Sequence, residues 1–251
     1  MEKIINDFYE VEVNDSLAII FIKKDVFRLL TTGTESELLL NTLDILQFDP
    51  KIKALLFLNT PECYGEKIYD SFLKEIMLFN KESKDIEIPA FCNDMARHRE
   101  INILNRFVQY LANYKKLCFT VLSGSIVTPF IGASLATDIR YATPEMFFSF
   151  AHNKYGLHPS GGLPYFLTHQ LGYNKALEII FSEKITSKEA LKLGLINKIV
   201  PRENLVEFII NKIEKITQFR SCTLRRTKQL SAYAHNSLSD YFTYEGSLLN
   251  L

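Results

Sequence analysis

The chain has 251 residues, which is enough for one domain with a large core or for one domain with a small appendage. Hydrophobic residues make up 47% of it and charged residues 23%, and its 29 Lys and Arg balance its 29 Asp and Glu. The zero formal net charge argues against a nucleic-acid-binding protein, which needs a basic surface, and leaves little repulsion against self-association.

The sequence shows no signal for export, membrane insertion or metal binding. The first residues, MEKIINDFYEVEV, have no apolar signal-peptide core, and no apolar run approaches the ~20 residues of a membrane span. The cysteines Cys63, Cys92, Cys118 and Cys222 are scattered without zinc-site spacing, so we expect buried thiols in a reducing compartment. We therefore expect a cytoplasmic protein with no metal or redox cofactor and no nucleic-acid or membrane partner.

The N-terminal part predicts a β-hairpin and then a βαβ unit. Residues 8–13 alternate apolar and polar side chains, residues 14–15 (Asn-Asp) supply a turn, and residues 17–22 are apolar and β-rich. A capping box at residues 34–37 (Thr-x-x-Glu) predicts the start of a helix, and residues 54–58 (ALLFL) predict a buried strand. This strand–helix–strand order favours parallel pairing through a right-handed crossover.

The rest of the chain predicts alternating helices and strands and then a mostly helical end. Helices are expected at 69–79, 101–114, 130–137, 205–216, 223–230 and 238–249, and strands at 117–122, 139–142 and 146–150. Residues 83–93 predict a loop, and a second capping box lies at 186–189. We therefore predict an α/β core over residues 1–200 and a helical C-terminal region over residues 201–251.

Five segments between residues 116 and 201 resemble a known family. They are KLCFTVLSG (116–124), ASLATDIRYAT (133–143), KYGLHPSGGLPYFL (154–167), LGYNKALEIIF (171–181) and ITSKEALKLGLINKIVP (185–201). In this order and without a gap, they resemble the crotonase superfamily of enoyl-CoA hydratases and isomerases. Residues 7–60 also fit the family's opening hairpin and first βαβ unit, and the match is poorest from 61 to 100.

The resemblance implies an α/β fold made of a spiral of ββα turns with two roughly perpendicular sheets. It implies that residues 201–251 are a trimerisation region, in a homotrimer or a dimer of trimers. It also implies an acyl-CoA thioester as substrate, with no further cofactor. In the family, two backbone N–H groups bind the thioester oxygen and stabilise an enolate, and nearby acid or base side chains, usually Glu, move protons or add water.

The second of these N–H donors is the first point at which the sequence departs from the family. Ungapped alignment places Pro129 at the donor position, and proline has no N–H. We expect Pro129 to occupy the first position of a helix instead, where proline is well accommodated. A shift of one residue would make the N–H of Thr128 or of Phe130 the donor.

The first donor is matched only loosely, by the loop at residues 62–67 (ECYGEK). Glu66 is our candidate for the donor position, and Gly65 would allow a close approach of backbone and ligand. Tyr64 is a candidate for the pocket wall. An ordinary turn that binds no ligand is the alternative interpretation of this loop.

Gly132 and His152 occupy the two positions that hold Glu in the family's hydratases. Gly132 has no side chain for acid–base work, so water addition by two carboxylates is not expected. His152 has an imidazole that can act as a general acid or base near neutral pH, which makes it our candidate catalytic residue. The alternative is a partly buried, hydrogen-bonded histidine without a chemical role.

Four further residues are candidates through the resemblance alone. His158 and Tyr155 lie in or beside a turn that packs near the acyl pocket in relatives. Lys24 and Arg28 match a region in which relatives contact the nucleotide of CoA. For these two cations, an ordinary solvated face is the alternative.

Three functions remain open from the sequence. The first is an isomerase, decarboxylase or other lyase that acts on an acyl thioester with His152 as its single proton carrier. The NKYGLHPSGG segment is similar to crotonase-like enzymes of polyketide assembly lines, so the thioester partner is either CoA or an acyl carrier protein. The second, an ordinary hydratase, requires a misalignment at Pro129, Gly132 and His152 together. The third is a non-catalytic relative that binds a thioester or a sister subunit, which Pro129 and Gly132 favour.

Overall fold

The computed structural model describes residues 4–78, 90–232 and 238–247. Its strands are β1 (Ile4–Ile5), β2 (Tyr9–Asn14), β3 (Leu17–Ile22), β4 (Ala54–Asn59), β5 (Leu117–Leu122), β6 (Ser125–Val127), β7 (Ile139–Ala142), β8 (Phe147–Ser149), β9 (Lys184–Thr186) and β10 (Lys198–Ile199). Its α-helices are α1 (Val26–Thr31), α2 (Gly33–Phe48), α3 (Glu66–Ile76), α4 (Asp94–Ala112), α5 (Thr128–Leu135), α6 (Leu163–Leu171), α7 (Tyr173–Ile180), α8 (Ser187–Lys192), α9 (Leu205–Thr217), α10 (Ser221–Ala232) and α11 (Leu238–Ser247), and the short 3-10 helices are η1 (Ala151–Tyr155) and η2 (Arg202–Asn204).

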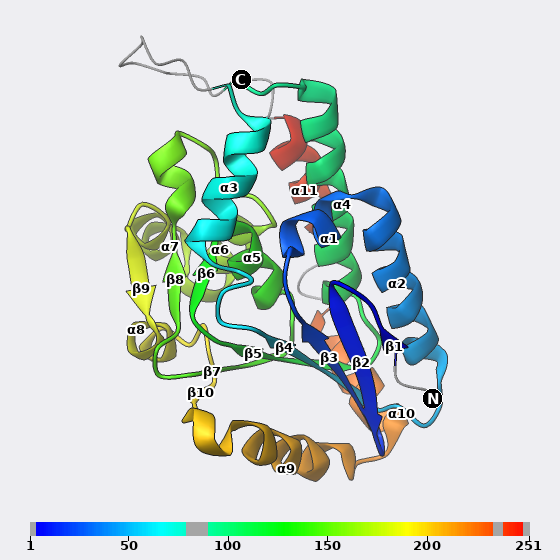
Figure 1. Ribbon diagram of the computed structural model, residues 1–251. Coiled ribbons are helices and arrows are strands. Elements are labelled where there is room, and N and C mark those ends of the chain that lie inside the picture. The colour runs from blue at the N-terminus through cyan, green and yellow to red at the C-terminus, as the bar shows by residue number, and fades with distance from the viewer. Residues whose placement is uncertain (1–3, 79–89, 233–237, 248–251) are drawn as a thin grey trace.

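The strands form two sheets. The larger has the order β1-β2-β3-β4-β5-β7-β10, antiparallel from β1 to β3 and parallel from β3 onward. The smaller has the order β6-β8-β9, and its strands run crosswise to β5 and β7 in Figure 1. This mixed α/β arrangement confirms the fold class predicted from the sequence.

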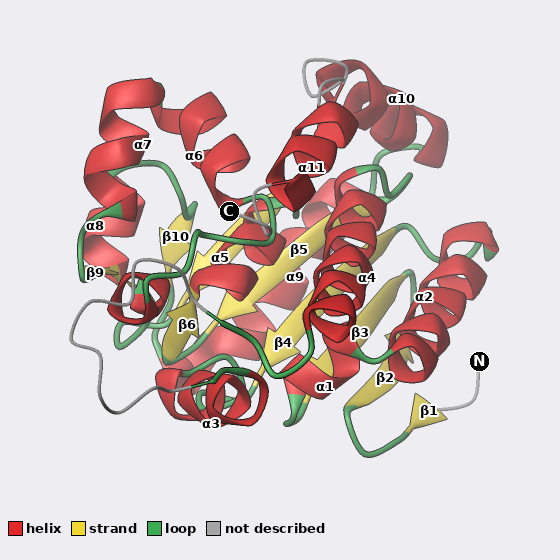
Figure 2. Cartoon of the chain, turned by 90° about the horizontal axis from the view of Figure 1, so that it is seen from above, coloured by secondary structure: helices red, strands yellow, loops and turns green. Residues whose placement is uncertain are grey.

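Helices cover both faces of the large sheet because its central strands are apolar on both faces. Leu55 and Phe57 of β4 belong to the core shared with α1, α2, α4 and α5. Their neighbours Ala54 and Leu56 belong to a second cluster that is closed by Ile209 of α9. Figure 1 shows α9 beneath the sheet, and Figure 2 shows α4 and α5 above it. The first helix of the C-terminal region therefore packs on this chain's own sheet.

The short sheet positions two elements that matter below. Strand β6 leads directly into α5, and β8 leads into η1. The two strands pair in parallel, with Val127 opposite Ser149. Because both strands end at the same edge, the first residue of α5 and the residues of η1 are brought together.

The N-terminal capping box predicted at residues 34–37 is wrong. Helix α2 begins at Gly33, and its N-cap residue Thr32 makes no side-chain capping bond. The reason is that α1, which the sequence did not predict, ends immediately before, and Thr32 terminates one helix and begins the next. The capping box of Thr186 and Glu189 is confirmed, with both of its hydrogen bonds formed.

Other boundaries shift by a few residues. Helix α3 begins three residues before the predicted 69–79, and residues 79–89, which include most of the predicted loop, lie outside the described part of the chain. Helix α4 begins well before residue 101, because the Asn93 side chain accepts a hydrogen bond from the N–H of Ala96. The expectation of buried thiols holds for Cys63 and Cys118 but is wrong for Cys92 and Cys222, which are exposed.

Candidate active site

Two helices begin side by side at the candidate site. Helix α3 begins at Glu66 after its N-cap residue Gly65, and α5 begins at Thr128 after Val127. The N–H of Val127 donates a 2.9 Å hydrogen bond to the carbonyl oxygen of Tyr64, which joins the two helix starts. First-turn N–H groups have no partner within their helix, and the helix dipole makes this end attractive to an anion. The two segments expected to supply oxyanion donors are therefore brought together.

Pro129 is the second residue of α5, one position later than expected. Proline is compatible with this place, since the missing N–H would have no partner within the helix. The position that alignment assigns to the second donor thus has no N–H. The neighbouring N–H groups of Thr128 and Phe130 belong to the same helical turn, so both remain candidates, together with Glu66 at the start of α3.

His152 lies in η1 and is 1% exposed. Its Nδ1 atom is 2.5 Å from the hydroxyl oxygen of Thr128, which holds the imidazole against the first residue of α5. Its Nε2 atom is buried and has no hydrogen-bond partner among the described residues. Burial, helped by the nearby His158, lowers the pKa of His152 to about 4, so the ring is neutral at pH 7. A neutral imidazole with an unpartnered ring nitrogen is suited to exchange a proton with a bound molecule.

Gly132 packs directly against the backbone of the loop at 160–162. A Cβ atom at residue 132 would lie 2.1 Å from the carbonyl oxygen of Gly161, far inside contact distance. A Cβ atom at Gly161 would in turn lie 2.6 Å from the carbonyl oxygen of Pro129. Helix α5 and this loop therefore touch backbone to backbone. The structure thus gives Gly132 a packing role, and a glutamate there would displace the loop.

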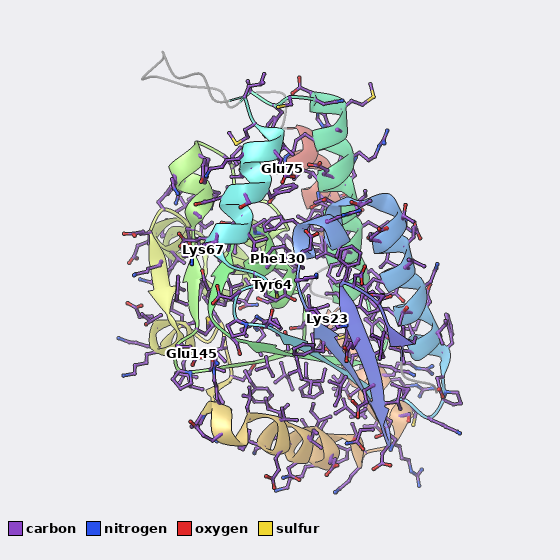
Figure 3. All side chains as sticks on the ribbon, in the orientation of Figure 1. Lys23, Tyr64, Lys67, Glu75, Phe130 and Glu145 are labelled. Carbon is purple, nitrogen blue, oxygen red and sulfur yellow. The ribbon has the colours of Figure 1, made fainter. Side chains whose placement is uncertain are left out.

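A cluster of aromatic rings joins α1, α3 and α5 beside these residues. Phe130 stacks on Tyr64 with ring centroids 4.8 Å apart, and it meets Phe27 edge-on at 4.7 Å. Figure 3 shows Tyr64 and Phe130 next to each other below the first turn of α3. Phe27 stacks in turn on Phe72 and Tyr69, at 4.8 and 5.5 Å. Contacts of this kind contribute about 0.5–1.5 kcal/mol each beyond area burial, so the rings hold the three helices together.

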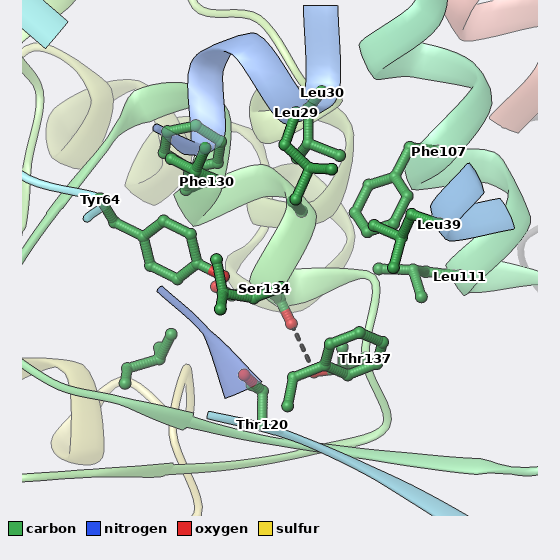
Figure 4. A pocket seen from close by; sticks show the side chains of 15 residues that line it. Leu29, Leu30, Leu39, Tyr64, Phe107, Leu111, Thr120, Phe130, Ser134 and Thr137 are labelled. Carbon is green, nitrogen blue, oxygen red and sulfur yellow. Dashed lines mark hydrogen bonds between the residues drawn. The ribbon is translucent and has the colours of Figure 1, made fainter. Parts of the chain in front are cut away.

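Two small cavities adjoin the aromatic cluster. The first has a volume of ≈ 30 Å³, and Figure 4 shows the Tyr64 ring pointing into it among mostly apolar side chains. The second has a volume of ≈ 10 Å³ and lies between Phe130, Pro129, Ser160 and the start of α4. One water molecule needs about 10–15 Å³, so neither cavity accommodates an acyl chain unless the rings move. Cavities of ≈ 430 and ≈ 630 Å³ also exist, but apart from Thr137 their lining residues differ from those of the two small cavities and include residues of α10.

The remaining expected residues are dispersed around this centre. The Tyr155 hydroxyl donates a 2.5 Å hydrogen bond to Asp70 of α3. His158 is half-buried beside His152, and burial lowers its pKa. Lys24 and Arg28 are exposed, before and within α1, and the Arg28 guanidinium lies 6.0 Å from the Phe8 ring.

Sequence reasoning missed a charged pair at the second cavity. Arg97 Nη1 donates a 3.1 Å hydrogen bond to Glu100 on the next turn of α4, and their side chains are only 11% and 20% exposed. The available signal was their spacing, since both residues interrupt the face of α4 that carries Ile101 and Leu104. Also missed was the hydrogen bond from Thr128 to His152, which no local pattern indicates.

Neither a metal-binding cluster nor a membrane-spanning helix occurs in the described ranges. No group of three or more His, Cys, Asp or Glu side chains there is placed to hold a metal ion. None of the helices in that part of the chain combines the length and the apolar character needed to span a bilayer.

Comparison with known structures supports the crotonase fold. An enoyl-CoA hydratase from Bacillus halodurans has a TM-score of 0.80 at 20% identity, over 97% of this chain and 94% of that one. An enoyl-CoA hydratase/isomerase from Cupriavidus metallidurans CH34 has a TM-score of 0.74 at 21% identity, over 97% and 87% of the two chains. DspI from Pseudomonas aeruginosa has a TM-score of 0.73 at 18% identity, over 96% and 92%.

The sequence comparison extends this from fold to family. Residues 104–250, more than half of the chain, match the family model described as enoyl-CoA hydratase/isomerase. This range contains α5, Gly132 and His152. The chain belongs to the enoyl-CoA hydratase/isomerase family.

Proposed function

We propose that this protein binds an acyl thioester and moves a proton on its acyl group, with His152 as the proton carrier. The proposal rests on the hydrogen bonding of the His152 ring. Thr128 holds its Nδ1, while its Nε2 is buried near the start of α5 and has no partner within the described part of the chain. A buried polar atom without a partner is unfavourable, which makes it a candidate contact for a ligand.

The neutral state of His152 favours isomerisation among the reactions that the sequence leaves open. A neutral imidazole accepts a proton from a carbon next to the thioester, and the electron pair moves to the thioester oxygen. First-turn N–H groups of α3 and α5, those of Glu66 and of Thr128 or Phe130, would stabilise this enolate. The imidazolium then returns the proton to a different carbon, so the double bond moves and the reaction needs no second reactant. Decarboxylation would instead release CO2 first and then call for a proton donor to the enolate, and a ring of pKa about 4 carries no proton to give at pH 7.

The thioester carrier is either CoA or the phosphopantetheine arm of a carrier protein. Both present the same pantetheine and thioester to the site, and only CoA adds a nucleotide with its phosphates. Lys24 and Arg28 are exposed near the start of α1 and would face these phosphates. No cofactor beyond the thioester is required by the proposed proton shift.

A non-catalytic function is the second candidate, and a specific observation favours it. The aromatic rings leave cavities of only ≈ 10 and ≈ 30 Å³ beside the two helix starts. Together with the absent N–H at Pro129, this would suit a relative that keeps the fold for binding a thioester or a sister subunit.

Calorimetric titration with CoA, acetyl-CoA and crotonyl-CoA separates these possibilities, with 3-butenoyl-CoA as the isomerisation substrate. We expect binding and a gain of crotonyl absorbance from 3-butenoyl-CoA. His152→Ala should abolish this turnover while leaving the affinity for acetyl-CoA within about twofold, because the imidazole acts on the acyl carbon rather than on the carrier. Equal turnover in the variant would refute the role of His152. Binding without any turnover would support the non-catalytic function, and loss of crotonyl absorbance would identify a hydratase.

We also propose that the protein forms homotrimers or dimers of trimers. Helix α7 is apolar on two faces: Ala176 and Ile179 are buried, whereas Tyr173, Leu177 and Phe181 are 67%, 36% and 73% exposed. These three residues form one stripe at helical spacing, as expected for a surface that a neighbouring subunit covers. Light scattering should give a trimeric mass that the double variant Leu177→Glu/Phe181→Glu lowers. A control variant at the isolated exposed residue Met95 should not lower it, and a monomeric wild type would refute this proposal.

A further inference from the structure

A largely buried guanidinium lies at the end of the second cavity. Arg97 belongs to α4, which is distant from α5 in the sequence. It nevertheless lines this cavity together with Pro129, Phe130 and Ser160. Only 11% of its side chain is exposed. The rings of Phe72 and Phe91 lie 5.8 and 5.4 Å from the guanidinium carbon and hold the group in place through cation–π contacts.

The hydrogen bonding of this guanidinium is incomplete. Its Nη1 is occupied by Glu100, at 3.1 Å. Its Nε is buried and has no partner among the described residues. A buried donor of a charged group that lacks an acceptor is more unfavourable than a neutral one. As far as the described residues go, Arg97 Nε is therefore a donor left for an added acceptor.

The shape of guanidinium defines which acceptor fits best. Nε shares one edge of the planar group with Nη2, and Glu100 is bound at Nη1, outside that edge. The Nε–Nη2 edge presents two parallel N–H groups, which match the two oxygens of a carboxylate. A neutral carbonyl or hydroxyl would use only one of these donors.

Arg97 lies close to the proposed site of the acyl chemistry. The cavity that it lines also touches Pro129 and Phe130 of the proposed oxyanion turn. Its positive charge also contributes to lowering the pKa of His158, in the loop next to His152. The cavity thus has the oxyanion turn on one side and a fixed positive charge on another.

We propose that the acyl group of the substrate ends in a carboxylate and that the Nε–Nη2 edge of Arg97 binds this carboxylate. The substrate would be the monothioester of a dicarboxylic acid, with its thioester at the first turns of α3 and α5. The aromatic rings around this ≈ 10 Å³ cavity would move aside to admit the acyl chain. Glu100 would then act as a positioning residue that holds Nη1 and orients the free edge. This inference rests on the thioester function proposed above.

The test compares matched thioesters that differ only in the terminal carboxylate. The pairs are succinyl-CoA with butyryl-CoA, glutaryl-CoA with pentanoyl-CoA, and adipyl-CoA with hexanoyl-CoA, each titrated against the full chain. We expect at least one acid to bind about tenfold or more tightly than its neutral partner, as a charge-assisted bidentate contact provides. This comparison needs only the wild-type protein, so it does not depend on whether a variant folds.

Variants on α4 then assign the preference to Arg97. Arg97→Gln should abolish the preference while changing the affinity for the neutral thioesters by less than about twofold, since only the carboxylate contact is lost. Arg97→Lys keeps the charge without the planar edge and should retain part of it. Glu100→Gln should lower the preference without abolishing it, because an amide oxygen can still accept from Nη1 but holds it less firmly than a carboxylate does. Arg106→Gln is the matched control: this arginine lies on the same helix, and its exposed side chain pairs with Glu37.

Each outcome bears on one of the two proposals. Equal affinity for acids and neutral thioesters, or an equal loss for both in Arg97→Gln, would overturn the role of Arg97 and leave the thioester function standing. Absence of binding by every thioester would overturn both proposals. A preference that Arg97→Gln removes and Arg106→Gln preserves would support both.

Discussion

The hydroxyl oxygen of Thr128 and Nδ1 of His152 lie 2.5 Å apart, and each residue is 1% exposed. Neither group can find water in place of the other, so this hydrogen bond sets the position of the imidazole. It also links the first residue of α5 to η1. In the proposed chemistry Thr128 is therefore the positioning residue of His152.

Replacing Thr128 by valine should weaken both the fold and the site. Thr128→Val leaves Nδ1 buried without a partner, so the free energy of unfolding should fall by about 1–3 kcal/mol in urea denaturation. Thr128→Ser keeps the hydroxyl and should lose much less. If 3-butenoyl-CoA is turned over, Thr128→Val should also shift the lower pKa of its pH–rate profile. An unchanged profile would mean that the contact is structural only.

The low pKa of His152 predicts that stability falls as the solution becomes acidic. Above about pH 6.5 the ring is neutral in both the folded and the unfolded chain, so its protonation does not affect stability. As pH falls from about 6.5 to about 4, the unfolded chain binds a proton that the folded chain does not, which stabilises the unfolded state. The loss from this residue should reach about 3 kcal/mol at the acid end.

Urea denaturation of wild type and His152→Gln across this pH range measures the effect. The variant lacks the imidazole, so its free energy of unfolding should decline less steeply. His158, whose pKa is also lowered, is present in both proteins and contributes equally. Identical pH dependence of the two proteins would show that His152 titrates normally.

Enlarging Gly132 by a single methyl group should be destabilising. The added Cβ of Gly132→Ala would meet the Gly161 carbonyl at 2.1 Å, so α5 or the loop must shift, at a cost of about 1–3 kcal/mol or more. Gly33→Ala is the matched control, because nothing lies within 4 Å of a Cβ at that helical position. It should change stability by less than about 1 kcal/mol. Similar melting temperatures for the two variants would contradict the contact.

Substitution of Pro129 tests whether the missing N–H limits the site. Pro129→Gly and Pro129→Ala both restore a backbone N–H in the first turn of α5, and with Thr128 or Phe130 as the donor neither should change the affinity for crotonyl-CoA by more than about twofold in calorimetry. Pro129→Gly should also lower the free energy of unfolding by about 1 kcal/mol, because the unfolded chain gains freedom. A gain in affinity for glycine alone would indicate flexibility as the cause. No gain in either variant would show that neighbouring N–H groups already serve.

Local patterns were enough to predict much of the fold. Strand β5 has the predicted bounds of residues 117–122, since a short apolar run between turn signals is unambiguous there. The capping box at Thr186 is confirmed because its two partners are three residues apart. The start of α2 was wrong because α1, a helix of one and a half turns, has no pattern long enough to detect.

The candidate site could be predicted only in part. Comparison with the family pattern singled out His152 and Pro129, because both lie in a part of the chain that aligns without a gap. The ring cluster could not be foreseen, because Phe27, Phe72 and Phe130 come from three separate helices. The same holds for the packing of Gly132, which sequence reasoning treated only as a lost carboxylate. Contacts between distant segments depend on the assembled fold, and a single sequence does not record them.

The backbone contact between α5 and the loop at Gly161 bears on how such a chain can change over generations. With 2.1 Å available at residue 132, a carboxylate cannot be introduced first and accommodated afterwards. The loop would have to be remodelled before any side chain appeared there, although that remodelling alone brings no catalytic gain. Acquiring a carboxylate at residue 132 would therefore begin with a change that brings no gain in activity.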